Sequence, residues 1–233
     1  MMRNSKEQHK AFYIPISVID SIRYEGIESY FNVIDEDDGG KQKREFFVEG
    51  INDYLIPIDE VLNSVDAAQL MDDCFSQKPF DIFISHSHEN EDDAIALSLY
   101  IKEKYKKDCF IDSLVWEYSK KIINRIKSQF SLSREELSYT QTNVHIMLAT
   151  SLMKMIRDTK KFIFIKSSES TLEENIGDVF TGSPWIYFEL LVANMMINKT
   201  SSMNESVSFM YPIDDLIKDF ERISDLKNLD KIR

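Results

Sequence analysis

The chain has 233 residues, of which 43% are hydrophobic and 12% aromatic, so it can bury a packed core and general disorder is excluded. Its 28 Lys and Arg against 40 Asp and Glu give a formal net charge of −12. This acidity disfavours a nucleic-acid backbone as partner, and the six glycines form no Gly-rich phosphate loop.

Two further features bear on location. Cys74 and Cys109 form neither a metal-ligand spacing nor a disulfide framework, which predicts a reducing, cytoplasmic location. No segment reaches the roughly 18 consecutive apolar residues that a membrane-spanning helix needs, and the first 20 residues carry no export signal. We therefore expect no membrane partner.

Residues 1–77 are predicted to form a small β-rich N-terminal extension, in which no residues indicate a chemical function. Short apolar runs predict four strands and a charged amphipathic run predicts a helix, with an Asp-Asp-Gly-Gly stretch forming an exposed hairpin loop. The strands are expected at 12–18, 30–34, 45–48 and 54–58, the loop at 35–43 and the helix at 59–75.

Residues 78–233 change to an alternation of short strands and helices. The run 81–85 is almost wholly apolar, as in a strand buried on both faces of a sheet. Further strands are expected at 109–112, 162–165 and 208–211, helices at 91–106, 116–130, 144–156, 185–196 and 213–229, and polar loops at 131–142 and 167–181.

This alternation predicts an α/β fold with right-handed crossovers and a central parallel sheet. In such sheets, ligands bind outside the carboxyl ends of the strands. That rule points to residues 85–88 and 112–116 as the surroundings of a site.

Three segments in order resemble the TIR (Toll/interleukin-1 receptor) family. Phe80-Asp-Ile-Phe-Ile-Ser-His86 resembles the opening strand of TIR domains, and Phe110-Ile-Asp112 resembles their second strand, followed by the BB loop. Ser183-Pro-Trp-Ile-Tyr-Phe-Glu189-Leu190 resembles the late Ser-x-Trp-Cys-x-x-Glu-Leu motif, with Ile186 at the usual Cys position. Ser113-Leu-Val-Trp116 looks most like bacterial TIR proteins of anti-phage defence, including the Thoeris type.

The resemblance implies a flavodoxin-like, three-layer TIR fold over residues 78–233, and an NAD+ glycohydrolase or ADP-ribosyl cyclase. Such enzymes cleave the nicotinamide–ribose bond, giving ADP-ribose or a cyclic signal derived from it. The motif glutamate, here Glu189, is the catalytic residue that the resemblance implies. Its carboxylate would orient the ribose and stabilise an oxocarbenium-like transition state.

The same resemblance implies the surroundings of the substrate. NAD+ is the substrate, and no cofactor or metal is expected. Self-association through TIR–TIR contacts is expected, as is a separate effector protein that reads the product. For Trp116 and Trp185, a role in packing is as well supported by the sequence as a role in substrate binding. The expected substrate-binding residues are Ser85, His86, Asp112, Ser113, Trp116 and Trp185.

Two alternatives stay open. The first is a non-enzymatic TIR scaffold, for which a motif carboxylate has no use. The second is a metal-dependent hydrolase, because His86-Ser-His88 partly resembles the metallo-β-lactamase His-x-His-x-Asp-His motif. Asn90-Glu91 replaces the Asp-His pair of that motif, and only His9 and His145 remain as further histidines.

Overall fold

The structure is a computed structural model that describes residues 9–24, 80–113, 123–124, 126–128, 131–175, 178–197 and 211–233. The chain divides into two compact units. The first comprises Met1–Phe31, Phe80–Ile111 and Met155–Arg233, and the second Asn32–Pro79 and Asp112–Lys154. The elements predicted between residues 30 and 75 lie outside the described residues, as does most of the predicted helix at 116–130.

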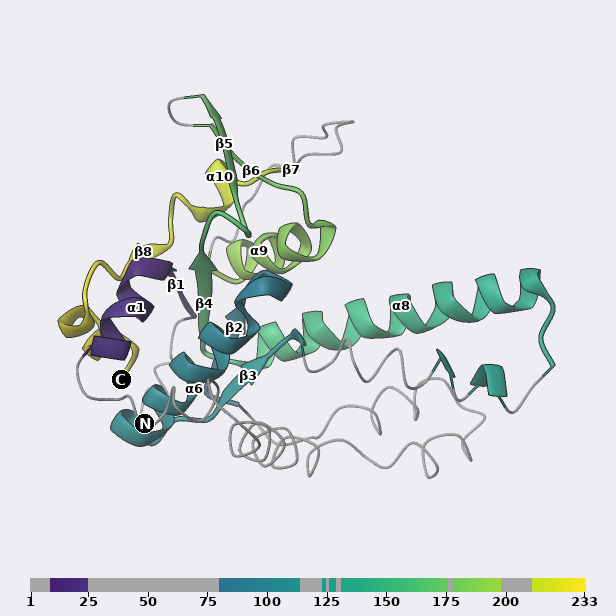
Figure 1. Cartoon of the computed structure of the whole chain (residues 1–233), viewed down its shortest axis with the longest axis horizontal. Helices are drawn as coiled ribbons and strands as arrows, with labels where there is room; N and C mark the ends of the chain where they lie inside the picture. Colours follow the sequence, from purple (N-terminus) through teal and green to yellow (C-terminus); the bar gives the residue numbers. More distant parts are fainter. Residues whose placement is uncertain are drawn as a thin grey trace, which may run out of the picture. The chain divides into compact units, whose positions relative to one another are not determined.

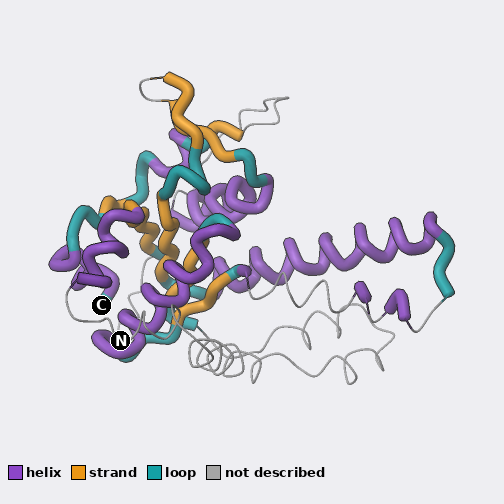
Figure 2. The backbone as a smooth tube through the Cα atoms, viewed as in Figure 1, coloured by secondary structure: helices purple, strands orange, loops and turns teal. Residues whose placement is uncertain are grey.

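The first unit contains a five-stranded parallel sheet, which Figure 2 shows at the centre of the surrounding helices. The strands lie in the order β3-β2-β4-β1-β8. This confirms an α/β fold with a central parallel sheet. The strands are β1 (Lys10–Pro15), β2 (Ile82–Ser85), β3 (Cys109–Ile111), β4 (Lys161–Lys166) and β8 (Glu221–Arg222).

Strand β1 comes from the segment that we assigned to the N-terminal extension, yet it lies inside this sheet. It pairs with β4 along its whole length, from Lys10↔Lys161 to Pro15↔Lys166, so distant parts of the sequence lie side by side (Figure 1). Its apolar side chains are buried, as an interior parallel strand requires. The expected strand at 12–18 ends early because helix α1 (Ile16–Tyr24) begins directly after Pro15. The boundary after residue 77 stays a prediction.

Helices cover both faces of the sheet. Helix α6 (Glu91–Tyr105) packs against β3 on one face, with Ser98 near the Cys109 thiol, and α1 packs against α6. The opposite face carries Ala11 and Phe162, which α9 (Pro184–Ile197) covers through its Ala193. On that second face, the Phe162 and Phe83 rings stack with their centroids 5.5 Å apart. This stack forms part of the core.

Helix α8 (Arg134–Asp158) begins within the segment that we expected to be the loop 131–142, so that expectation is wrong. A reciprocal capping box starts the helix: the Ser133 amide donates to Glu136 Oε2 at 2.8 Å, and the Glu136 amide donates to Ser133 Oγ at 3.3 Å. This satisfies two amide groups that a helix otherwise leaves unpaired at its amino end. The Ser-x-x-Glu spacing was a readable signal for this start.

A second sheet corrects the predicted loop at 167–181. Strands β5 (Leu172–Asn175), β6 (Asp178–Thr181) and β7 (Tyr211–Pro212) form three antiparallel strands in that order. The Val179 amide donates to the Asp214 carboxylate at 2.8 Å, which ties this sheet to the segment after β7. Helix α9 starts shortly after β6.

The predicted closing helix at 213–229 is also wrong. Three short elements occupy this segment: α10 (Asp214–Ile217), β8 and the 3-10 helix η2 (Leu226–Ile232). The Ile223 amide donates to the Tyr13 carbonyl at 3.0 Å, so pairing with the edge of the central sheet replaces a continuous helix. Asp225 then caps η2 by accepting from the Asn228 amide.

Candidate functional site

The carboxyl end of β2 presents buried polar side chains. Ser85 is the last residue of the strand and is fully buried, and His86 follows it at 3% exposure. The Ser85 hydroxyl has no hydrogen-bond partner among the described residues. Buried hydroxyls in proteins are nearly always bonded, so this one is available to a ligand.

The loops after β2 and β4 are fixed to each other through Asn90, the last residue of the 3-10 helix η1 (His88–Asn90). The Asn90 side-chain oxygen accepts the Ser87 hydroxyl at 2.8 Å and the Ser167 hydroxyl at 2.6 Å. Ser170 Oγ in turn donates to the Ile165 carbonyl at 3.0 Å. These buried bonds hold the carboxyl edge of the sheet in one geometry. Sequence reasoning missed Asn90 and Ser167, whose signal was a polar cluster following each of two buried strands.

Helix α9 starts as its sequence dictates. The Ser183 hydroxyl accepts the Ile186 amide at 3.3 Å, as a capping residue does, and Pro184 takes the first helical position, where its missing N–H costs nothing. The Ser-Pro-Trp stretch of the motif thus acts as the start of the helix. Trp185 is half-buried, and its ring lies edge-on to the Phe188 ring, with the ring centroids 6.3 Å apart.

Glu189 is fully buried on α9, with 0% of its surface exposed. Glutamate is almost never fully buried in proteins unless it is paired, because removing a carboxylate from water is costly. Glu189 is therefore not a solvated residue of the helix surface.

The geometry of α9 determines where Glu189 lies along the direction of the strands. Ala193 lies beside Ala11 and Phe162, near the amino ends of their strands. Glu189 is four residues earlier on the same face of α9, about 6 Å nearer the carboxyl ends. Two residues of a strand also span about 6–7 Å, so Glu189 lies near Phe164, which is two residues after Phe162 on β4. The residue paired with Phe164 on β2 is Ser85. Glu189 and Ser85 therefore face the same layer, between α9 and the sheet, at about the same height.

The other expected residues have different surroundings. Asp112 and Ser113 follow β3 directly and are 5% and 2% exposed, and both belong to the second compact unit. Trp116 lies outside the described residues. Ser85, His86, Trp185 and Glu189 belong to the first unit.

The metal-site alternative finds no support. His86 is buried whereas His88 is exposed, although they are only two residues apart. In the part of the chain that the structure describes, no three His, Cys, Asp or Glu side chains gather as a metal-binding cluster. Among the same residues, no helix has the length and apolar character to cross a membrane.

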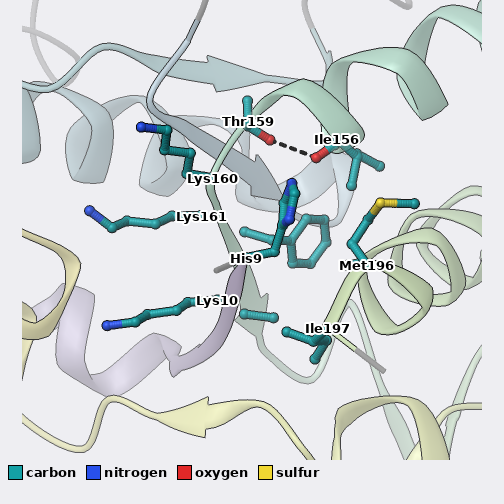
Figure 3. Close-up of a pocket in the computed structure, with 11 residues that line it drawn as sticks. His9, Lys10, Ile156, Thr159, Lys160, Lys161, Met196 and Ile197 are labelled. Carbon is teal, nitrogen blue, oxygen red and sulfur yellow. Dashed lines mark hydrogen bonds between the residues drawn. The ribbon is translucent and has the colours of Figure 1, made fainter. Parts of the chain in front are cut away.

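A small cavity at the opposite edge of the sheet is not a ligand site (Figure 3). Its volume is about 10 Å³, which holds one water molecule at most. Figure 3 shows Lys10, Lys160 and Lys161 extending to one side, away from Met196. His9 lines the cavity and forms a 2.8 Å hydrogen bond between its Nε2 and the Arg157 carbonyl.

Fold and site together define an α/β protein with a polar, buried carboxyl edge. No protein-family model, curated protein or solved structure matches the chain. The chemistry of the site therefore rests on the residues themselves.

Proposed function

We propose that the chain is a TIR-type enzyme that cleaves the nicotinamide–ribose bond of NAD+, with Glu189 as the catalytic carboxylate. The observation that carries this proposal is the complete burial of Glu189 in the layer that also contains Ser85. A carboxylate in a dry layer stabilises positive charge far more strongly than one in water.

The strand order supports the flavodoxin-like part of the proposal. Counted from β2, the first three strands lie in the order second-first-third, as in flavodoxin-like sheets of order 2-1-3-4-5. The fourth position belongs to β1, which comes earlier in the chain. The chain thus departs from simple TIR connectivity at that position, while α9 still follows the third strand of this count and carries the motif glutamate.

The reaction needs little from the protein beyond Glu189. Nicotinamide leaves as a neutral ring, and the ribose becomes oxocarbenium-like. Glu189 accepts hydrogen bonds from the ribose hydroxyls and stabilises the growing positive charge. Ser85 and His86 contact the ribose or a phosphate. Water then completes hydrolysis to ADP-ribose, or another atom of the same molecule closes a cyclic product.

The wider proposal is a role in bacterial anti-phage defence, with self-association and a separate effector that reads the product. It rests on the resemblance of residues 113–116 and of the three motif segments. A non-enzymatic scaffold gives no reason to bury Glu189, so we do not favour it.

The test is nicotinamide release from NAD+ by the purified full chain, measured by liquid chromatography. Glu189→Gln keeps the side-chain volume and removes the charge, and we expect release to fall by at least about a hundredfold. Glu103→Gln, an exposed residue of α6, is the matched control and should leave release unchanged. No release from the wild type at high protein concentration with crowding agent and phage lysate would overturn the proposal, as would equal release from the Glu189 variant.

A further inference from the structure

An open cavity of about 540 Å³ lies at the carboxyl ends of β1 and β4. Its position follows from the topology. Strand β1 leads into α1 on one face of the sheet, whereas β4 leads toward α9 on the opposite face. Two adjacent parallel strands whose chains leave to opposite faces open a crevice between them, which is where ligands of α/β proteins bind.

Two cations flank the end of β1 within this cavity. Arg222 pairs with Tyr13 from one side, and Lys166 pairs with Pro15 from the other. Tyr13 and Pro15 are two residues apart, so all four side chains emerge on the same face. Adjacent strands are about 4.8 Å apart, which separates the two cationic strands by about 10 Å, a span that an anion can bridge.

The charge of the cavity contrasts with that of the chain. No Asp or Glu is among the described residues that line it, although the chain carries a net charge of −12. Among those residues, the Arg222 side chain has no ion-pair partner, and it is exposed. An arginine fork without an ion-pair partner among the described residues suits a phosphate, which it can contact through two parallel hydrogen bonds.

The remaining polar lining divides into fixed walls and available donors. Ser167 and Thr171 are buried and bonded internally: the Ser167 hydroxyl donates to Asn90, and the Thr171 hydroxyl donates to the Ser167 carbonyl at 2.8 Å. Ser17 is exposed in the first turn of α1, where backbone amides have no partner within the helix. These amides add to the attraction of Lys166 and Arg222 for an anion.

One acidic residue stands next to the cavity. The Glu169 carboxylate accepts the Ser168 hydroxyl at 2.8 Å, and this bond lowers the pKa of Glu169 below its ordinary value. Glu169 is therefore charged at neutral pH and opposes an incoming anion. Its removal should strengthen binding.

We infer that this cavity binds the phosphate group of a small organic phosphate of nucleotide size. A volume of about 540 Å³ exceeds what a free ion needs and falls in the range of ligand pockets. Tyr13, Pro15 and Ile16 supply an apolar wall for the rest of the ligand. The inference does not depend on NAD+ cleavage, because Glu189 is not among the residues that line the cavity.

Isothermal titration of the full chain with AMP, adenosine and inorganic phosphate tests the inference. AMP should bind, and adenosine should bind at least tenfold more weakly. Arg222→Gln and Lys166→Gln should each weaken AMP binding about tenfold, the loss expected for one charged hydrogen bond. Glu169→Gln should strengthen binding severalfold. Lys218→Gln is the matched control, because Lys218 is exposed, pairs with Asp215 at 3.0 Å and does not line the cavity.

A further variant, Ser17→Glu, places a carboxylate in the cavity and should abolish AMP binding. Tighter binding of AMP than of inorganic phosphate supports an organic ligand, and equal binding of the two would overturn a ligand of nucleotide size. Equal binding of adenosine and AMP would overturn the inference, as would Arg222→Gln and Lys166→Gln variants that bind AMP like Lys218→Gln. AMP binding and nicotinamide release are separate measurements on the same full chain, so a failure of this inference and a failure of NAD+ cleavage can be told apart.

Discussion

The two edges of the central sheet differ in how their polar groups are used. At the amino edge they satisfy one another: the Asp81 carboxylate accepts Lys107 Nζ at 2.8 Å and the Asp108 amide at 3.1 Å, and Lys161 Nζ donates to the Arg233 carbonyl. At the carboxyl edge, Ser85 is buried and its hydroxyl has no hydrogen-bond partner in the described part of the chain, and Arg222 lines an open cavity.

This difference separates structural from functional polar residues within one sheet. The cavity at the amino edge has a volume of about 10 Å³, against about 540 Å³ at the carboxyl edge. Charged residues are therefore no guide to a site by themselves, since both edges carry lysines. What distinguishes the carboxyl edge is space combined with donors, Ser85 and Arg222, that have no side-chain partner among the described residues.

Thiol reactivity should show the largest contrast between the edges. Burial raises the pKa of the Cys109 thiol, at the amino end of β3, to about 12. In a Cys74→Ser background, native Cys109 should react with Ellman's reagent at pH 7.5 at least about a thousandfold more slowly than the thiol introduced by Ser17→Cys, because only the thiolate reacts. Stopped-flow absorbance gives both rates. AMP should slow the reaction at position 17 alone, and rates within tenfold of each other would contradict a sealed amino edge.

The Asn90 hydrogen bonds should dominate the stability of the carboxyl edge. Asn90→Ala leaves the buried Ser87 and Ser167 hydroxyls without their acceptor and should lower the free energy of unfolding by about 3 kcal/mol. Urea unfolding followed by circular dichroism measures this. Asn228→Ala removes two exposed hydrogen bonds, to Ser224 and Asp225, and should cost less than about 1 kcal/mol. Equal losses would mean that the bonds between the two loops do not fix this edge.

Ser85 should separate function from stability. Ser85→Ala should lower kcat/KM for nicotinamide release about tenfold, because a ligand contact is lost. It should change the free energy of unfolding by less than about 1 kcal/mol, because the hydroxyl has no partner among the described residues. Ser21→Ala, an exposed site on α1, serves as the control for activity. Unchanged kcat/KM together with a large loss of stability would make Ser85 a structural residue.

Much of this sheet could be predicted from the sequence, but its pairing could not. Strands at 81–85, 109–112 and 162–165 are short apolar runs between helical patterns, so local burial signals were sufficient. The position of β1 beside β4 depends on pairing between two segments that are far apart in the sequence, from Lys10↔Lys161 onward. No local pattern encodes such pairing. The hairpin of β5 and β6 was missed because its charged residues lack the alternation of a half-buried strand.

The candidate site shows the same division. Composition assigns Glu189 to the surface, and only the motif around it predicted a special role. Asn90 and Ser167 each belong to a polar cluster after a buried strand, but they are 77 positions apart, so the sequence could not pair them. Arg222 was missed because its segment was expected to form a helix. A helix prediction gives no indication that Arg222 pairs with Tyr13 in the sheet.

Asp81 should give the smallest effect and complete the contrast. Burial alone would raise the pKa of Asp81, but hydrogen bonds from Lys107 and the Asp108 amide outweigh it and lower the pKa below the ordinary 3.8. Asp81→Asn should therefore lower the free energy of unfolding at pH 7 by less than about 1 kcal/mol, since the pair is partly exposed. Nicotinamide release and AMP affinity should not change.

The sign of the pH dependence provides the decisive check on Asp81. A carboxylate with a depressed pKa in the folded state stabilises the protein above its unfolded pKa, and this contribution disappears as the pH falls through the folded value. The stability difference between wild type and Asp81→Asn should thus be constant from pH 7 to about pH 5 and shrink below about pH 4 in urea unfolding experiments. A difference that persists at pH 2, or a loss of nicotinamide release, would show that the amino edge is not merely structural.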